Sequence, residues 1–395
     1  MHPNVPHLRF PEFHGEWEKC KLGDIATLTK GSGISKDQRS ATGTPCILYG
    51  ELYTTYKSEV IDYVVSKTDI SDKNLVRSCA NDIIIPSSGE TAIDISTARC
   101  VLSPDVLLGG DLNIIRLKDG DGRFFSYQLN GVRKHDIAKI AQGVSVVHLY
   151  GESIKGLTVS FPSNKEQQKI STLLSLIDER IATQSKLIED LKKLKSAIID
   201  YAINSLDTDF AKFGSLYEIA GEGGTPTTSN ANFYDNGKIP FIKIDDLKKK
   251  YLTENKDFIT ELGLQKSSAW LVPTRSILFS NGATIGEITI TTYPVCTKQG
   301  ILGIVPKQNI DVEFLYYFMS SSYFKKAVSR IVTEGTMKTA YLKDINNILC
   351  PIPTKEKQQE IAEMPSALNS KIDFEQSILK LFCSQKQHLL RQMFI

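Results

Sequence analysis

Two short stretches, Pro162-Ser-Asn-Lys-Glu-Gln-Gln-Lys-Ile170 and Pro353-Thr-Lys-Glu-Lys-Gln-Gln-Glu-Ile361, decide how this chain is organised. They begin 191 residues apart and share the proline, both glutamines and the isoleucine, while their differing charges largely swap sign. A long segment with helical apolar periodicity follows each stretch, and proline with serine or threonine is typical of a helix start. The sequence therefore predicts two copies of one unit.

The duplication extends through both halves of the chain. Leu22-Gly-Asp-Ile-Ala26 matches Leu216-Tyr-Glu-Ile-Ala220, and Asp82-Ile-Ile-Ile85 matches Ser276-Ile-Leu-Phe279, each at an offset of 194 residues. A period near 190 residues is far too long for a solenoid. We predict the order domain, helix, domain, helix, with boundaries at 1–161, 162–205, 206–352 and 353–395.

Both predicted helices carry an apolar seam with steps of three and four residues, which is the pattern of a coiled coil. The first, over 166–203, would span roughly 57 Å at 1.5 Å per residue. If a two-fold axis relates the halves, the two helices form an antiparallel coiled coil with one domain at each end; the alternative is that each helix packs on its own domain. The seam residues are Ile170, Leu174, Ile177, Ile181, Ile188, Leu191 and Ile198 in the first helix, and Ile361, Leu368, Ile372, Leu379 and Phe382 in the second.

Polar residues interrupt both seams at matching positions. Gln184 and Lys195 interrupt the first seam, and Glu375 and Lys386 interrupt the second, again 191 residues later. Pro365 stands where the first helix has a leucine, so we expect it to kink or break the second helix near its start.

Each globular domain is predicted to be α+β, because short β-branched runs alternate with turns and one or two helical segments. The fold class is thus two similar α+β domains joined by two long helices, with a pseudo-two-fold internal repeat. The runs expected as strands are 83–85, 91–95, 113–117, 276–279 and 287–291, and the segments expected as helices are 124–141 and 312–330.

Composition excludes several classes of protein. The 395 residues carry a net charge of +2, so nucleic-acid binding would have to come from local arrangement. Seven widely spaced cysteines fit reduced thiols, and the chain shows neither a secretory signal nor an apolar run long enough for a membrane span, which favours the cytoplasm. The sequence has no Walker phosphate loop, no H-E-x-x-H motif and no Pro-Pro pair of an amino-methyltransferase. Two near-copies without catalytic motifs suggest that the protein binds twice and does not catalyse.

At this point the motifs resemble a known family. Val5-Pro-His-Leu-Arg-Phe-Pro-Glu-Phe13, Gly15-Glu-Trp17 and Lys21-Leu-Gly-Asp-Ile25 are similar to the start of a type I restriction–modification specificity subunit, as found in Firmicutes. Phe213-Gly-Ser-Leu-Tyr-Glu-Ile219 with Gly223-Gly-Thr-Pro226 resembles the start of the second target-recognition domain of such a protein. The two Pro-x-x-x-x-Gln-Gln-x-Ile stretches resemble the conserved spacer regions of the family, so the resemblance covers essentially the whole chain.

The resemblance implies a non-catalytic subunit whose two domains each recognise one half of a bipartite, asymmetric target in double-stranded DNA. It implies that the helices set the gap between the halves and bind two methyltransferase subunits, which methylate adenine N6 with S-adenosylmethionine. Two further restriction subunits would translocate and cut DNA with ATP and Mg²⁺, as a defence against phage. None of these cofactors is expected on this chain.

Given that resemblance, polar loop residues that follow strands are the best candidates for base contacts, because loops carry function on a rigid scaffold. Lysines near the same loops are candidates for phosphate contacts. In the first domain the candidates are Lys30, Lys36, Ser87, Ser88, Glu90, Thr91, Gln142, Ser145 and His148, and in the second they are Lys243, Lys248, Asn281, Thr284, Glu334, Thr336, Lys338 and Thr339.

Two alternatives stay open at this stage. One is a fused DNA-modifying enzyme with its own recognition half, against which the missing catalytic motifs argue. The other is a non-catalytic scaffold with two protein-binding modules on a coiled-coil spacer, which predicts no salt-sensitive binding of DNA.

Overall fold

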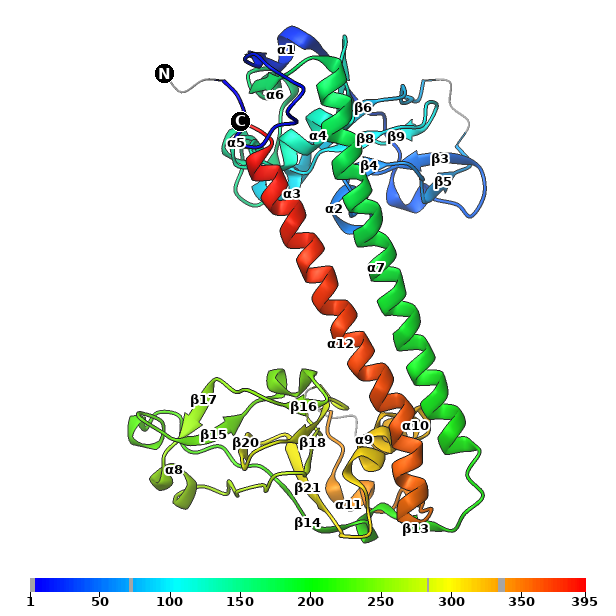
Figure 1. The fold of residues 1–395 in the computed structure, drawn as a ribbon, viewed down its shortest axis with the longest axis vertical. Helices are drawn as coiled ribbons and strands as arrows, with labels where there is room; N and C mark the ends of the chain where they lie inside the picture. The colour runs from blue at the N-terminus through cyan, green and yellow to red at the C-terminus, as the bar shows by residue number, and fades with distance from the viewer. Residues whose placement is uncertain (1–3, 71–73, 283, 333–337) are drawn as a thin grey trace. The chain divides into compact units, whose positions relative to one another are not determined.

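The computed structural model describes residues 4–70, 74–282, 284–332 and 338–395 (Figure 1). The chain forms two compact units: unit 1 is Met1–Lys186 with Ser377–Ile395, and unit 2 is Leu187–Gln376. The long helices α7 (Asn164–Asn204) and α12 (Lys355–Gln392) each contribute to both units. Each unit therefore contains its own domain and one stretch of each long helix.

Among its described residues, unit 1 contains twelve short strands, and five of them form its main sheet. Its strands are β1 (Glu18–Lys21), β2 (Ala26–Lys30), β3 (Thr44–Ile47), β4 (Val60–Ile61), β5 (Ser66–Thr68), β6 (Asp82–Pro86), β7 (Ser88–Gly89), β8 (Arg99–Val101), β9 (Leu107–Leu108), β10 (Leu112–Leu117), β11 (Val147–His148) and β12 (Thr158–Phe161). The main sheet has the order β2-β10-β6-β8-β4 and is antiparallel except between β4 and β8. Smaller sheets have the orders β5-β3-β9, β1-β12 and β11-β7.

The central strand β6 shows why this sheet is buried on both faces. All five residues of β6 are buried. Ile83 and Ile85 join one apolar cluster with Phe124 and Leu174, whereas Ile84 joins a second cluster on the other face. This alternation is the period of two expected of a strand, and a strand covered on both sides is continuously apolar.

Short helices surround the sheet of unit 1. They are α1 (Leu22–Ile25), the 3-10 helix η1 (Lys36–Gln38), α2 (Glu51–Thr54), α3 (Ala92–Ile95), α4 (Gly122–Asn130), α5 (Lys134–Ile140) and α6 (Gly151–Lys155). Two predictions need correction here. The run 91–95 forms α3 and not a strand, because the Thr91 hydroxyl accepts a hydrogen bond from the Asp94 amide (3.2 Å) and caps a helix. The single helix predicted over 124–141 is two helices separated at Gly131.

Unit 2 repeats the topology of unit 1. Its strands are β13 (Phe210–Lys212), β14 (Tyr217–Glu222), β15 (Ile239–Ile242), β16 (Tyr251–Leu252), β17 (Asp257–Ile259), β18 (Ile277–Ser280), β19 (Ile288–Thr291), β20 (Cys296–Thr297), β21 (Ile301–Pro306) and β22 (Leu349–Pro351). The main sheet has the order β14-β21-β18-β19-β16, and the smaller ones are β17-β15-β20 and β13-β22. Matched strand by strand, these three orders equal three of those in unit 1, whose fourth sheet, β11-β7, has no counterpart among the described residues of unit 2. Ile277 and Phe279 again face one cluster, and Leu278 faces the other.

Most helices of unit 2 have a counterpart in unit 1, but among the described residues α3 of unit 1 and α8 of unit 2 have none. The helices of unit 2 are η2 (Phe213–Ser215), η3 (Ala231–Phe233), η4 (Ile244–Lys248), α8 (Glu261–Gln265), α9 (Val312–Ser320), α10 (Ser322–Ile331) and α11 (Leu342–Ile345). The helix predicted over 312–330 is interrupted at Ser321, whose hydroxyl accepts from the Phe324 amide (3.2 Å) and starts α10. The internal repeat and the α+β class are both confirmed by these matching orders.

The two long helices run antiparallel within each unit. In unit 1, Asp178 of α7 contacts Lys386 of α12, and Ile170 shares a core cluster with Met393. In unit 2, Lys195 of α7 contacts Asn369 of α12, and the start of α12 packs on the end of α7. In both units, residues later in α7 contact residues earlier in α12, as expected of antiparallel helices.

Two expectations about these helices differ from the structure. α12 continues through Pro365, so the proline does not break the helix. Near the end of α7 the buried residues are Ile199 and Ile203, each 4% exposed, while the predicted seam residue Ile198 lines a cavity. The seam shifts by one residue there because a straight helix drifts out of a strict seven-residue repeat.

None of the helices in the described part of the chain is long and apolar enough to cross a membrane.

Candidate nucleic-acid interface and helix anchors

In unit 1 several predicted recognition residues meet at one corner of the main sheet. β7 pairs with β11, which places Ser88 opposite His148. The Leu149 amide donates to the Ser87 carbonyl (2.9 Å), and Gln142 and His148 exchange two backbone hydrogen bonds of 2.9 and 2.7 Å. The structure thus joins two segments that are distant in the sequence, and we name this region corner 1 (residues 87–91 and 142–149).

The exposed part of corner 1 is the turn between Gln142 and His148. Gly143 has φ +121°, a left-handed conformation that glycine adopts without strain. The turn carries Val144, which is 97% exposed, and the exposed Ser145. Within the predicted set, Gln142, His148, Glu90 and Thr91 are also exposed, Ser88 is half-buried and Ser87 is buried.

The two candidate lysines of unit 1 lie in neighbouring loops. Lys30 ends β2 opposite Asn113, and Lys36 lies in η1; both are exposed. Lys36 lines a cavity of about 1010 Å³ together with Arg39 and Asp111. Because the Asp111 carbonyl accepts from the Ser87 amide (2.7 Å), this cavity adjoins corner 1.

Unit 2 forms the equivalent corner, which we name corner 2 (residues 281–282, 284 and 338–340). The Ala340 amide donates to the Asn281 carbonyl (2.9 Å), as Leu149 does to Ser87 in unit 1. Asn281 is only 1% exposed, and its side-chain amide donates to the Ala340 carbonyl (3.3 Å). Lys338 and Thr284 are exposed and Thr339 is half-buried, while Glu334 and Thr336 lie outside the described residues.

The candidate lysines of unit 2 are already paired with carboxylates. Lys243 pairs with Asp257 (2.7 Å) and Lys248 pairs with Asp245 (3.0 Å) beside a cavity of about 710 Å³. Such exposed pairs contribute little stability, so a phosphate can compete for either lysine. Lys250, the last of three consecutive lysines, is only 5% exposed.

The predicted seam residues of both helices turn inward. Ile170 and Leu174 belong to the core of unit 1, and Ile361 belongs to the core of unit 2 with Ile199 and Ile203. The ends of the seams therefore pack into the domains as well as against the other helix. Buried members are Ile170, Leu174, Ile177, Ile188, Ile361 and Ile372, and half-buried members are Ile181, Leu191, Leu368, Leu379 and Phe382.

The repeated Gln-Gln pair has a structural role that sequence reasoning did not predict. The Gln167 side chain accepts from the Asp121 amide (2.9 Å) and donates to the Pro162 carbonyl (2.8 Å). Gln358 does the same with Asp311 (2.8 Å) and Pro353 (2.9 Å). Both aspartates cap the next helix of their domain, α4 or α9. The first glutamine of each pair thus ties the start of a long helix to its domain.

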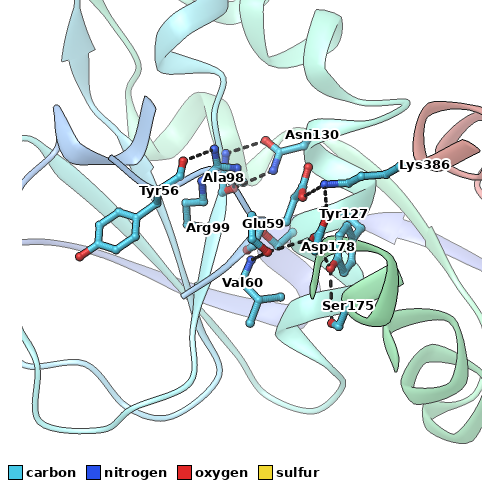
Figure 2. Close-up of polar contacts among 12 residues, drawn as sticks. Tyr56, Glu59, Val60, Ala98, Arg99, Tyr127, Asn130, Ser175, Asp178 and Lys386 are labelled. Atoms are coloured by element: carbon cyan, nitrogen blue, oxygen red, sulfur yellow. Dashed lines mark hydrogen bonds and ion pairs between the residues drawn. The ribbon is translucent and has the colours of Figure 1, made fainter. Parts of the chain in front are cut away.

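A buried polar network anchors α12 to unit 1 (Figure 2). The Lys386 ammonium pairs with Asp178 (2.6 Å) and with Glu59, which immediately precedes β4. Asp178 also accepts from the hydroxyls of Tyr127 (2.8 Å) and Ser58 (3.0 Å). Burial alone would lower the pKa of Lys386, but the two facing carboxylates outweigh it and raise that pKa.

Arginine and asparagine extend this network into the sheet. The Arg99 guanidinium donates to the Leu52 carbonyl (3.1 Å) and the Tyr56 carbonyl (3.0 Å), and burial lowers its pKa. The Asn130 side chain bonds both the amide and the carbonyl of Ala98 (2.8 and 2.7 Å; Figure 2). The only sequence signal for the network was the lysine that interrupts the second seam, because its partners lie far away in the chain.

Unit 2 contains the counterpart of this network with different charges. Lys250 precedes β16 as Glu59 precedes β4, and its ammonium donates to Ser366 (2.9 Å) and pairs with Glu313. Lys195, the counterpart of Lys386, donates to Asn369 (3.0 Å), which stands where unit 1 has Asp178. Burial lowers the pKa of Lys195, and nearby lysines add to this effect.

Comparison with known proteins identifies the family. The sequence profile of the type I restriction modification DNA specificity domain matches residues 14–193 and 206–381, which is most of the chain in two copies. The chain belongs to the type I restriction–modification specificity family. The two matches coincide with the two copies of the repeated unit.

Relatives in this family are distant, and some match over nearly their full length while others match over about half. The type I restriction enzyme MjaIX specificity subunit of Methanocaldococcus jannaschii is 23% identical over 388 residues, covering 90% of this chain and 88% of that protein. The EcoR124I/EcoR124II specificity subunit of Escherichia coli is 25% identical over 225 residues, covering 54% of this chain and 55% of that protein. Further relatives come from mycoplasmas, so the predicted likeness to Firmicutes is not confirmed.

Solved structures of the family share the fold. The crystal structure of the type I restriction–modification system S subunit from M. genitalium has a TM-score of 0.63 at 19% identity and covers 99% of both chains. A second structure, described as the basis of complex assembly and conformational transition of the type I system, has a TM-score of 0.60 at 14% identity over 96% of this chain and 97% of that chain.

Proposed function

We propose that this chain is the DNA sequence-specificity subunit of a type I restriction–modification complex and that it recognises a bipartite, asymmetric target in double-stranded DNA. The observation that carries the proposal is the pair of corners, built by the same backbone hydrogen bond on sheets of the same order. The scaffold is repeated, but the side chains differ: His148 of corner 1 corresponds to Thr339 of corner 2, and Val147 corresponds to the exposed Lys338. Different side chains on equal scaffolds would recognise two different half-sites.

In this proposal the chemistry belongs to partner subunits. Two methyltransferase subunits would bind the helices and methylate adenine N6 with S-adenosylmethionine, and two further subunits would translocate and cut DNA with ATP and Mg²⁺. The near-neutral charge of the chain fits partners that supply much of the phosphate contact. The complex would act in the cytoplasm, and this chain would contribute recognition and no catalytic residue.

The test is to map methylated adenines in a host that expresses the chain with its cognate methyltransferase. We expect a two-part motif with a fixed gap. The variant Gln142→Ala/His148→Ala should relax one half-site, and Lys338→Ala should relax only the other. A motif in one part, or a change of both half-sites by either variant, would refute the proposal, as would methylation or cleavage by the purified chain alone.

The gap gives a second test, because it would depend on helix length. Insertion of about four residues, roughly one helical turn, after Thr183 and after Phe374 should lengthen the gap and leave both half-sites unchanged. A matched control replaces four exposed residues at the same places without changing the length. An altered half-site with the original gap would contradict the role of the helices.

A further inference from the structure

Each unit has a groove where the first turns of one long helix meet the last turns of the other. In unit 1, which gives groove 1, these are residues 164–173 of α7 and the end of α12. In unit 2, which gives groove 2, they are residues 355–364 of α12 and the end of α7. The two grooves are equivalent positions of the internal repeat, so their differences are informative.

Groove 1 is filled by the N-terminal arm, residues 4–17. The Arg9 guanidinium makes two hydrogen bonds of 2.8 Å to the Glu166 carboxylate. Lys169 pairs with Glu12, and its ammonium lies 4.6 Å from the centre of the Phe10 ring. Phe10 packs against the core of unit 1. Glu166, bound by Arg9 of the arm, is only 1% exposed.

Groove 2 has no such covering among residues 187–282, 284–332 and 338–376. It forms a cavity of about 650 Å³ whose lining includes Ile198, Tyr201, Lys357 and Met364. Tyr201 is 77% exposed and Met364 is 59% exposed, although both lie beside the buried Ile361. Neighbouring exposed apolar side chains in a hollow are typical of a binding surface.

The charges that hold the arm are reversed in groove 2. Lys357 stands where groove 1 has Glu166, and Glu360 stands where it has Lys169. With no arm to bind, Lys357 and Glu360 pair with each other (2.9 Å), and both are largely exposed. The apolar position is kept, because Met364 replaces Leu173.

We propose that groove 2 binds an extended segment of a partner protein. The segment carries a large apolar side chain for the hollow between Tyr201 and Met364, an acidic residue for Lys357 and a basic residue for Glu360. The arm of a second copy of this chain does not fit, because its Arg9 would face Lys357 and its Glu12 would face Glu360. This assignment does not depend on the proposed recognition of DNA.

The test uses two peptides and the full chain. One peptide has the sequence of residues 4–17, and the other has the same sequence with Arg9→Glu and Glu12→Lys. In both, a photoreactive benzoylphenylalanine replaces Phe10. We expect the charge-swapped peptide to bind about tenfold more tightly at low salt, since two like-charge contacts become two exposed ion pairs. Its cross-links should fall within residues 198–208 or 353–364.

Variants make the assignment specific. Lys357→Glu/Glu360→Lys gives groove 2 the charges of groove 1, and it should reverse the preference between the peptides. Tyr201→Ser/Met364→Gln should weaken the charge-swapped peptide severalfold, whereas Lys326→Glu, an exposed lysine of α10 outside the groove, should not. Equal binding of both peptides, cross-links elsewhere, or a preference unchanged by the charge reversal would overturn the proposal.

Discussion

The two units place a lysine at equivalent positions of the long helices but surround it with different charges. Lys386 lies between the carboxylates of Glu59 and Asp178 in unit 1. Lys195 meets the neutral Asn369 in unit 2, where a second lysine, Lys250, replaces the glutamate. The residue before the edge strand, Glu59 before β4 and Lys250 before β16, thus faces the long helix in both units, but its charge differs.

This difference shows which contacts the repeated fold requires. The glutamine anchors, the helix caps and the sheet order are the same in both units. In unit 1 the lysine of the long helix itself pairs with carboxylates, whereas in unit 2 the buried ion pair is formed by Lys250 and Glu313. A buried ion pair contributes little net stability over apolar packing, but removal of one partner is costly. We therefore expect the docking of α12 in unit 1 to be more sensitive to substitution of Lys386 than unit 2 is to substitution of Lys195.

The largest effect is expected for Lys386→Met. This substitution leaves Glu59 and Asp178 buried without a cation, and we expect unit 1 to lose about 3–5 kcal/mol of unfolding free energy. The chain has two tryptophans, Trp17 in unit 1 and Trp270 in unit 2. Urea unfolding followed by the fluorescence of Trp17 in a Trp270→Phe background measures unit 1 separately.

A compensated variant distinguishes charge from packing. Adding Glu59→Gln and Asp178→Asn to Lys386→Met removes all three charges, so most of the loss should be recovered. If the triple variant is no more stable than Lys386→Met alone, packing of the lysine stem and not the uncompensated carboxylates carries the effect.

The glutamine anchors should behave alike in both units. Gln167→Ala or Gln358→Ala leaves one backbone amide and one carbonyl without their partner, which costs about 2–3 kcal/mol in either case. The matched controls are Gln168→Ala and Gln359→Ala, because Gln167 and Gln358 are buried while these neighbours are exposed. A loss confined to one unit would contradict the equivalence of the two anchors.

A smaller effect is expected for Arg9→Met, which tests the N-terminal arm. Glu166 loses its bidentate partner, but the arm can move away and admit water, so the cost should stay near 1–2 kcal/mol. Hydrogen exchange should show faster exchange of the Leu8 amide, which donates to the Gln392 carbonyl (2.9 Å). Unchanged exchange at Leu8 would mean that the arm is held by its apolar contacts.

The sequence could predict the repeat, the fold class and the long helices, because these depend on local periodicity and on matching motifs. It could not predict the buried network, since Glu59 and Lys386 are 327 residues apart and only tertiary structure brings them together. It also assigned 91–95 to a strand, because the β-branched residues outweighed the cap formed by Thr91. Among the candidate recognition residues, the meeting of segments 87–91 and 142–149 required the pairing of β7 and β11.

The smallest effect, and one of opposite sign, is expected for Lys195→Met. Burial lowers the pKa of Lys195 from 10.5, with Lys250 adding to the effect and Asp373 opposing it, so the charged form is disfavoured in the fold. The free-energy cost of burying the charged lysine is fully present at neutral pH, where Lys195 is charged in both the folded and the unfolded state. The cost is relieved as pH rises through the lowered pKa towards 10.5, because the folded state then loses the proton first.

Lys195→Met should therefore leave unit 2 as stable as the parent or more stable by up to about 1 kcal/mol at pH 7, since the lost hydrogen bond to Asn369 offsets part of the gain. That advantage should shrink as pH approaches 10.5. Urea unfolding followed by Trp270 in a Trp17→Phe background, at several pH values, measures the trend. A loss as large as that of Lys386→Met would mean that the charge around this position does not matter, and that both lysines act through packing alone.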